Sequence, residues 1–96
     1  MIAAFVTFRY GNDFDAAKLN KIAETARGRF EGMPNLRQKA FTVKPAAREA
    51  VNVYLWENEA AARAFFTNEM LDRVTGLYGV RPTIEYAEIP ALVENG

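Results

Sequence analysis

The stretch that most constrains the fold is Val51-Asn-Val-Tyr-Leu-Trp56, which runs directly into the acidic and alanine-rich segment 57–62. Side chains of a strand alternate between its two faces, so this stretch places an amide, a phenol and an indole on one face. That face consists of Asn52, Tyr54 and Trp56. Buried polar groups need hydrogen-bond partners. A face of this kind is therefore predicted to be half exposed or to line a pocket.

The rest of the chain predicts three further strands and two helical regions. Strands are expected at 2–9, 36–43, 49–57 and 83–89. The first strand is apolar on both faces, which is typical of a central position in a sheet. The first helix is expected to begin at an Asp13 N-cap and to end by Gly32, and the second to begin at Asn58. The pair Thr67-Asn68 is expected to break the second helix, which resumes over 69–77.

The order of elements is β-α-β-β-α-β, the ferredoxin-like pattern of the α+β class, and residues 1–96 are expected to form one domain. In this pattern two helices cover one face of a four-stranded antiparallel sheet and the other face is bare. The bare face would expose Val51, Val53 and Leu55. Burying a large aliphatic side chain contributes roughly 1.5–3 kcal/mol, so a cover is strongly favoured. A second copy of the sheet provides it, and the pattern predicts a homodimer, the dimeric α+β barrel.

Composition excludes several classes of function. The chain has no Cys and no His, which removes disulfides, thiolate and histidine catalysis, and histidine-ligated zinc or haem. No acidic loop has the spacing of a metal site, and the glycines at 76 and 79 do not make a dinucleotide-binding fingerprint, so neither a metal nor a cofactor is predicted. Twelve basic residues balance twelve acidic ones without runs, which argues against nucleic-acid and membrane partners. No apolar run could span a bilayer and no signal-peptide pattern is present, so the cytoplasm is the expected compartment.

Asn52, Trp56 and Glu57 also carry a family resemblance. An asparagine on the third strand, a tryptophan four residues later and an acidic residue opening a helix resemble the antibiotic-biosynthesis monooxygenases, and the segments 32–36 and 78–82 add to the likeness. These proteins belong to the dimeric α+β barrel superfamily, and the chain is most similar to its small mono-oxygenase branch. The resemblance implies cofactor-free oxygenation of a small aromatic or enolisable compound by dioxygen. The substrate loses a proton, its carbanion reduces dioxygen, and a peroxide collapses to a quinone or ketone.

The resemblance further implies that Asn52 and Trp56 are catalytic, as hydrogen-bond donors to the enolate or peroxide oxygen. The substrate-binding wall is expected to include Phe5, Tyr54, Phe65, Arg73 and Tyr78. A base is missing, because Ala62 occupies the helix position where some relatives have a tyrosine. One of the tyrosines at 54, 78 and 86 would have to act in its place, or the substrate must be acidic enough to ionise unaided.

Other interpretations remain open. The pocket could serve a non-catalytic ligand-binding or assembly protein, or an isomerase or cyclase that stabilises an enolate without oxygen. An RNA-binding sheet shares the element order, but its basic-Gly-aromatic signature is absent. Trp56 and Asn52 could be plain core residues, and Arg73 a solvated helix charge. Arg37, Lys39 and Arg81 are interpreted as exposed charges.

Overall fold

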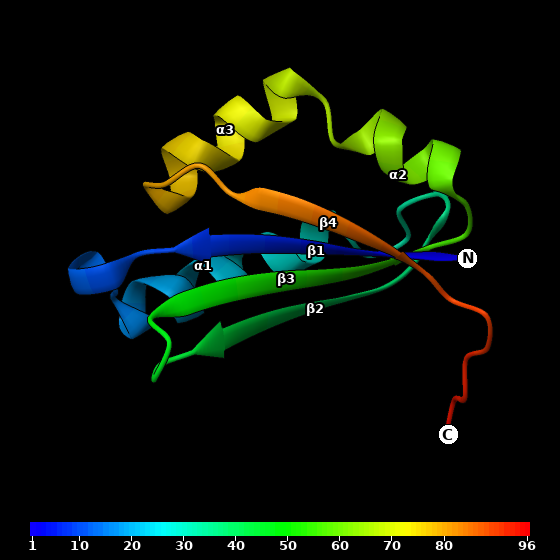
Figure 1. Ribbon diagram of the computed structural model, residues 1–96, viewed down its shortest axis with the longest axis horizontal. Helices are drawn as coiled ribbons and strands as arrows, with labels where there is room; N and C mark the ends of the chain where they lie inside the picture. Colours follow the sequence, from blue (N-terminus) through cyan, green and yellow to red (C-terminus); the bar gives the residue numbers. More distant parts are fainter.

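The computed structural model describes residues 1–96 and contains the predicted elements in the predicted order (Figure 1). The strands are β1 (Ile2–Arg9), β2 (Leu36–Lys44), β3 (Glu49–Trp56) and β4 (Thr83–Glu88). The helices are α1 (Ala16–Ala26), α2 (Glu59–Phe65) and α3 (Asn68–Tyr78), with 3-10 turns η1 (Gly11–Asp13) and η2 (Arg27–Arg29). None of the helices has both the length and the apolar character needed to cross a membrane.

The four strands form one sheet in the order β2-β3-β1-β4, and every neighbouring pair is antiparallel. This is the ferredoxin-like arrangement, so the predicted fold class is confirmed. β1 and β3 are the central strands and β4 lies at an edge, as the apolar content of β1 and the flanking prolines of β4 predicted. The irregularity in the sheet is a register shift between Leu36 and Gln38 at the start of β2.

The helix ends are set by side chains that cap free backbone N–H groups. Asn58 accepts from Ala61 N at 2.8 Å, which confirms the predicted start of α2. Thr67 accepts from Met70 N at 3.1 Å and separates α3 from α2, which confirms the predicted break. The N-cap prediction for the first helix was wrong, because Asp13 lies in η1. Asp15 makes that cap and accepts from the N–H of the residue at position 18.

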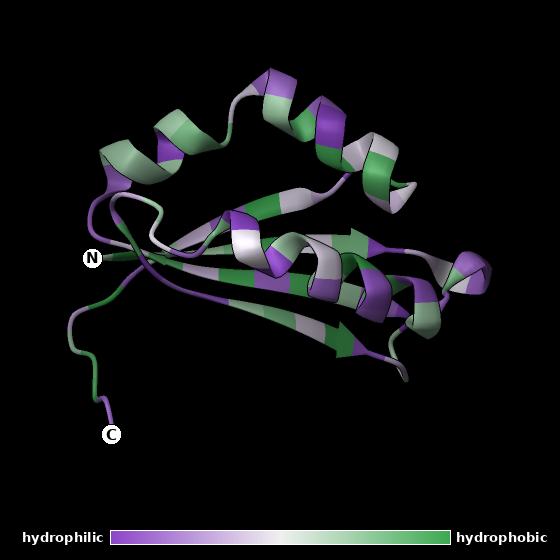
Figure 2. Cartoon of the chain, turned by 180° about the vertical axis from the view of Figure 1, so that it is seen from behind, coloured by the Kyte–Doolittle hydropathy of each residue, from purple (hydrophilic) through white to green (hydrophobic).

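One face of the sheet is covered by the helices. Figure 2 shows α1 in front of the sheet and running roughly along the strands, with α2 and α3 forming an arc along the β4 side. The core on this face consists of alternate residues of the two central strands: Ile2, Ala4, Val6 and Phe8 from β1, and Ala50, Tyr54 and Trp56 from β3. Asn52 is the polar member of the same β3 face and is also buried.

The opposite face carries no element of this chain, and Figure 1 has it turned toward the reader with α1 behind the sheet. Its side chains are the other members of the same alternation. Phe5 is 36% exposed there, and Val51, Val53 and Leu55 are half-buried. The bare, largely apolar face that the sequence pattern required is therefore present.

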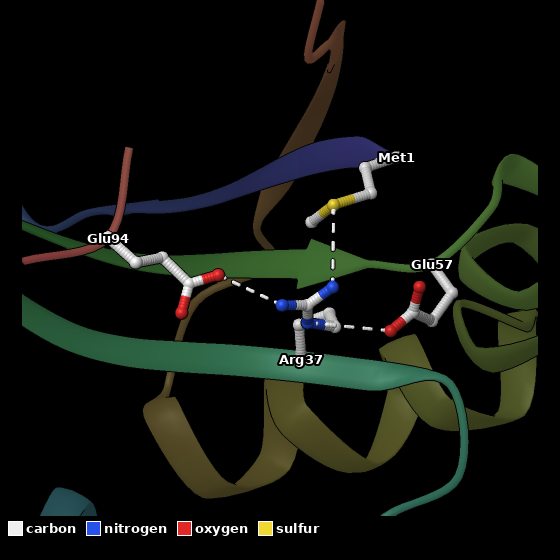
Figure 3. Close-up of polar contacts among 4 residues, drawn as sticks. All are labelled: Met1, Arg37, Glu57 and Glu94. Atoms are coloured by element: carbon white, nitrogen blue, oxygen red, sulfur yellow. Dashed lines mark hydrogen bonds and ion pairs between the residues drawn. The ribbon is translucent and has the colours of Figure 1, made fainter. Parts of the chain in front are cut away.

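Arg37 of β2 connects both chain termini to the start of α2 (Figure 3). Its guanidinium lies 2.9 Å from a carboxylate oxygen of Glu94 and 3.5 Å from one of Glu57, and Met1 Sδ is 4.0 Å from Nη1. All these groups are solvent-exposed, so the cluster contributes little to stability and mainly fixes where the C-terminal segment runs.

Candidate functional site

The centre of the covered face is an aromatic cluster formed by Phe30, Tyr54, Trp56, Phe65 and Phe66. The rings of Tyr54 and Trp56 are parallel, with centroids 5.9 Å apart. Phe65 lies 5.1 Å from Trp56, and Phe66 packs edge-on against Tyr54 at 5.0 Å. Phe30, from the segment after η2, contacts Tyr54 edge-on at 6.0 Å. The last turn of α2 therefore meets the face of β3 that carries Asn52, Tyr54 and Trp56 at this cluster.

Asn52 and Tyr78 form the one buried side-chain hydrogen bond of the site. Asn52 Nδ2 donates to the Tyr78 hydroxyl oxygen at 3.0 Å, and the two residues are 4% and 5% exposed. The Tyr78 ring stacks on Phe8 with a centroid distance of 3.8 Å. The Tyr10 hydroxyl donates to the Tyr78 carbonyl at 2.9 Å. The end of α3 is thus held against β1, and the Asn52 amide is held in one orientation.

Trp56 carries the one buried side-chain polar atom without a hydrogen-bond partner, its indole Nε1. Trp56 is only 2% exposed, so its N–H cannot donate to bulk water as a surface group does. A buried donor without a partner costs about 1–3 kcal/mol. Such groups are rare in folded proteins, and each one calls for an explanation.

Two open clefts flank the aromatic cluster and share Phe30 as a wall. The α2–α3 cleft, of about 580 Å³, is lined mainly by apolar side chains that include Met33, Phe65 and Met70, with Arg29 and Arg73 also on its wall. The α1–β2 cleft, of about 510 Å³, has Leu36, Lys39 and Phe41 along its strand side. Both volumes are in the range of small-molecule sites.

The structure brings most of the predicted site residues together on the covered face, at different depths. Phe65 and Arg73 line the α2–α3 cleft. Asn52, Tyr54, Trp56 and Tyr78 are buried in the core and line neither cleft.

Phe5 is a correction to the predicted pocket. It pairs with Val53 and lies on the bare face of the sheet, opposite the cluster, because odd-numbered residues of β1 point away from the helices. Phe5 therefore cannot share a pocket with Asn52. Both faces of β1 are apolar, so the sequence alone did not distinguish them.

Lys39 is the residue that the sequence interpretation missed. Its Nζ lies 3.3 Å from the centroid of the Phe30 ring, 4.1 Å from that of Phe41 and 4.4 Å from that of Tyr54. It is therefore caged by aromatic rings rather than exposed, although it does lie on an edge strand as expected. The available signal was its alternation with Phe41 and Val43, which places all three on one face of β2.

Burial lowers the pKa of Lys39 to about 7, because an ammonium loses hydration among apolar groups. The surrounding rings act in the opposite direction, since their faces attract a cation. None of the ion pairs in the structure includes Lys39. Its charge therefore has no counter-ion within the chain.

The tyrosines are poor candidates for the missing base. Burial raises the pKa of Tyr54, Tyr78 and Tyr86, and it raises that of Tyr10 to about 12. A phenol with a raised pKa stays protonated near neutral pH, where it donates a hydrogen bond and does not accept a proton.

Basic side chains without a carboxylate partner gather around the covered face. Six of the twelve basic residues form ion pairs, and Arg48 bonds to Asn12. The remaining five are Lys18, Lys21, Arg29, Lys39 and Arg73. Lys39 lines the α1–β2 cleft, Arg29 and Arg73 line the α2–α3 cleft, and Lys18 and Lys21 line a third hollow between α1 and the end of α3. No group of three or more acidic side chains is placed to hold a metal ion. The clefts therefore favour an anionic ligand.

Known structures with this architecture include oxygenases. The ActVA-Orf6 monooxygenase of Streptomyces coelicolor, solved in complex with nanaomycin D, superimposes with a TM-score of 0.68 at 19% identity, over 99% of this chain and 92% of that one. The chain has the fold of an antibiotic biosynthesis monooxygenase. A further monooxygenase of that name matches with a TM-score of 0.60 at 14% identity, over 95% of this chain and 100% of that one. A variant of SnoaB, a cofactor-independent oxygenase from Streptomyces nogalater, matches with a TM-score of 0.59 at 16% identity over 98% of each chain.

No protein-family model matches the sequence, and no curated protein matches it either. The predicted resemblance to antibiotic-biosynthesis monooxygenases is therefore confirmed for the fold, through solved structures.

Proposed function

We propose that this protein is a cofactor-independent monooxygenase that acts on a small aromatic or enolisable compound. The single observation that carries the proposal is the buried indole N–H of Trp56, which lacks a partner and lies on the same strand face as the Asn52–Tyr78 pair. A donor kept unpaired in an apolar site stabilises negative charge that develops on a ligand oxygen, and it does so without reorganisation. The fold shared with ActVA-Orf6 and SnoaB supports this choice of chemistry.

The reaction needs no redox group from the protein. A benzylic CH₂ flanked by rings or carbonyls loses a proton, and the resulting carbanion gives its electrons to dioxygen. The peroxide that forms breaks its O–O bond, so that the carbon becomes a carbonyl and the other oxygen leaves as water. Asn52 and Trp56 donate hydrogen bonds to the enolate and then to the peroxide. Arg73, on the wall of the α2–α3 cleft, anchors an anionic or carbonyl group of the substrate.

The working unit in this proposal is a homodimer formed through the bare face of the sheet. Phe5, Val51, Val53 and Leu55 supply an apolar surface there that a second sheet would bury. The substrate clefts lie on the other side of the sheet, so both copies remain open to ligand.

Oxygen consumption with an anthrone tests the chemistry. Asn52→Ala and Trp56→Phe each remove a donor, and each should slow turnover by on the order of 10²-fold, the usual effect of losing one such donor. Tyr86→Phe is the control, because Tyr86 is only half-buried and makes no hydrogen bond through its hydroxyl in this structure. Equal turnover in the wild type and both site variants would exclude Asn52 and Trp56 from the chemistry. Oxygen uptake that never exceeds the enzyme-free rate would rule the oxygenase out.

A non-catalytic ligand-binding protein is the second candidate, and one observation favours it. Asn52 already satisfies its amide with Tyr78, and neither Asn52 nor Trp56 reaches a cleft wall. This function predicts tight binding of an aromatic anion with no oxygen uptake above the enzyme-free rate. An isomerase or cyclase would instead convert substrate without consuming oxygen, so an anaerobic product assay separates all three.

A further inference from the structure

The environment of Lys39 is unusual for a lysine that has no structural partner. Lysine ammonium groups usually remain in water while their stems pack on apolar surface. Lys39 instead places Nζ among Phe30, Phe41 and Tyr54, and the closest of these rings is 3.3 Å away. It also lines the α1–β2 cleft, so the same atom is within reach of a ligand from outside.

The charged groups around this cleft leave Lys39 without an anion. Arg27 from η2 pairs with Glu31 of the following loop at 3.8 Å. Arg37 of β2 pairs with Glu94 near the C-terminus and with Glu57 just before α2. Glu24 of α1 also lines the cleft, but it is exposed and makes no ion pair with Lys39. From β3 only the Tyr54 phenol faces the amine, and burial keeps that phenol protonated by raising its pKa.

A cation in an apolar site is stabilised when an anion enters beside it. An acidic phenol or enol is the ligand class that fits. Phe30, Leu36 and Phe41 line the same cleft as Lys39, so the rings of such a ligand would pack against them and its oxygen would lie at Nζ. If Lys39 is an amine, the ligand O–H bond breaks, the proton joins the nitrogen lone pair and the oxygen keeps the electrons. If it is already an ammonium, the phenolate binds from solution, and the resulting ion pair is the same.

The position of Lys39 connects this ion pair to the proposed reaction. Lys39 pairs directly with Tyr54 in the sheet, and Phe41 pairs with Asn52. Lys39 and Asn52 are therefore diagonal neighbours on one face, at a separation of about 7–8 Å that is general for such pairs. A ligand of two or three fused rings spans that distance. Phe30, the wall common to both clefts, is the side chain that has to move to let it do so.

We propose that Lys39 is the proton acceptor and anion-binding residue of the site, and that it holds an acidic phenol or enol as its anion in the α1–β2 cleft. This inference rests on the proposed function for its substrate class, since the phenolate or enolate is the species that reacts with dioxygen. In this proposal Lys39 is the base that the sequence analysis left unassigned.

The test uses 2-hydroxyanthraquinone under anaerobic conditions, because its absorption moves to longer wavelength when the hydroxyl ionises and no oxygen chemistry can follow. Bound to the wild type, the dye should ionise at a lower pH than in water. Lys39→Met should reduce the ionisation constant of the bound dye about tenfold or more, whereas Lys39→Arg, a permanent cation, should still bind the anion. The neutral 2-methoxyanthraquinone should bind the wild type and Lys39→Met equally.

Lys44→Met is the matched control, because Lys44 lies on the same strand but is exposed and already paired with Glu49. It should behave as the wild type does. The inference is overturned if Lys39→Met ionises the bound dye at the wild-type pH, or if the wild type does not bind the dye. If the wild type ionises the dye but consumes no oxygen with an anthrone, the proposed role of Lys39 is retained and the proposed oxygenase function is rejected. If Lys39→Met oxygenates an anthrone at the wild-type rate, the proposed function stands and the role of Lys39 fails.

Discussion

The pKa of Lys39 gives a prediction at the scale of one residue. Burial lowers it to about 7 in the folded protein, whereas an unfolded lysine titrates near 10.4. Between these values the unfolded chain binds more protons, so this residue makes stability rise with pH over that window, and below it the cost of the buried charge is fully present. Lys39→Met should therefore be more stable than the wild type at pH 6, and the gain should shrink toward pH 10. Urea unfolding at several pH values measures this, with Lys44→Met as the control. A gain that does not vary with pH would mean that the rings hold the ammonium as well as water does.

At the scale of elements, the α2–α3 joint predicts where the molecule opens. Phe66 leaves the helical conformation and Thr67 starts α3 anew, so two short helices meet above the cluster. Short helices depend on tertiary packing more than on their own propensity. Residues 66–80 should exchange amide hydrogens faster than the strands, and 2-hydroxyanthraquinone should slow that exchange. Mass-spectrometric hydrogen exchange checks both statements, with α1 as the internal reference. Protection that is uniform in the free protein and unchanged by the dye would make the joint a simple bend.

Local sequence signals explain why the elements were predictable and the site was less so. Asn58 and Thr67 cap helices through contacts within three residues, and the strand at 51–56 shows its alternation directly. By contrast, which face of β1 turns toward the helices depends on packing among distant segments, and so Phe5 was placed wrongly. The environment of Lys39 depends on Phe30, a residue from another element, so the position of the charge in the sequence did not reveal the cage.

At the scale of the whole molecule, the bare sheet face predicts the assembly. Its central strip pairs Phe5 with Val53 across the two middle strands, and Ala40 of β2 pairs with Val53 from the other side. Val53 is therefore at the centre of the surface that a second copy would cover. Val53→Lys would place an ammonium in the middle of that interface, where burial without a partner costs far more than the lost apolar contact. We expect the wild type to be a dimer at micromolar concentration and Val53→Lys to be a monomer or unfolded.

Light scattering coupled to size exclusion, together with circular dichroism, distinguishes the outcomes for Val53→Lys. Glu85→Lys is the matched control. It adds the same side chain on the same face but at the edge strand β4, where residue 85 is exposed, and a rim charge changes association only weakly. A folded monomeric wild type at micromolar concentration would remove the barrel from the proposal. A dimeric Val53→Lys would place the interface on another surface.

The two clefts lie on the helix side of the sheet, so a folded Val53→Lys monomer should still bind 2-hydroxyanthraquinone. Loss of that binding would mean that the dimer supports the site.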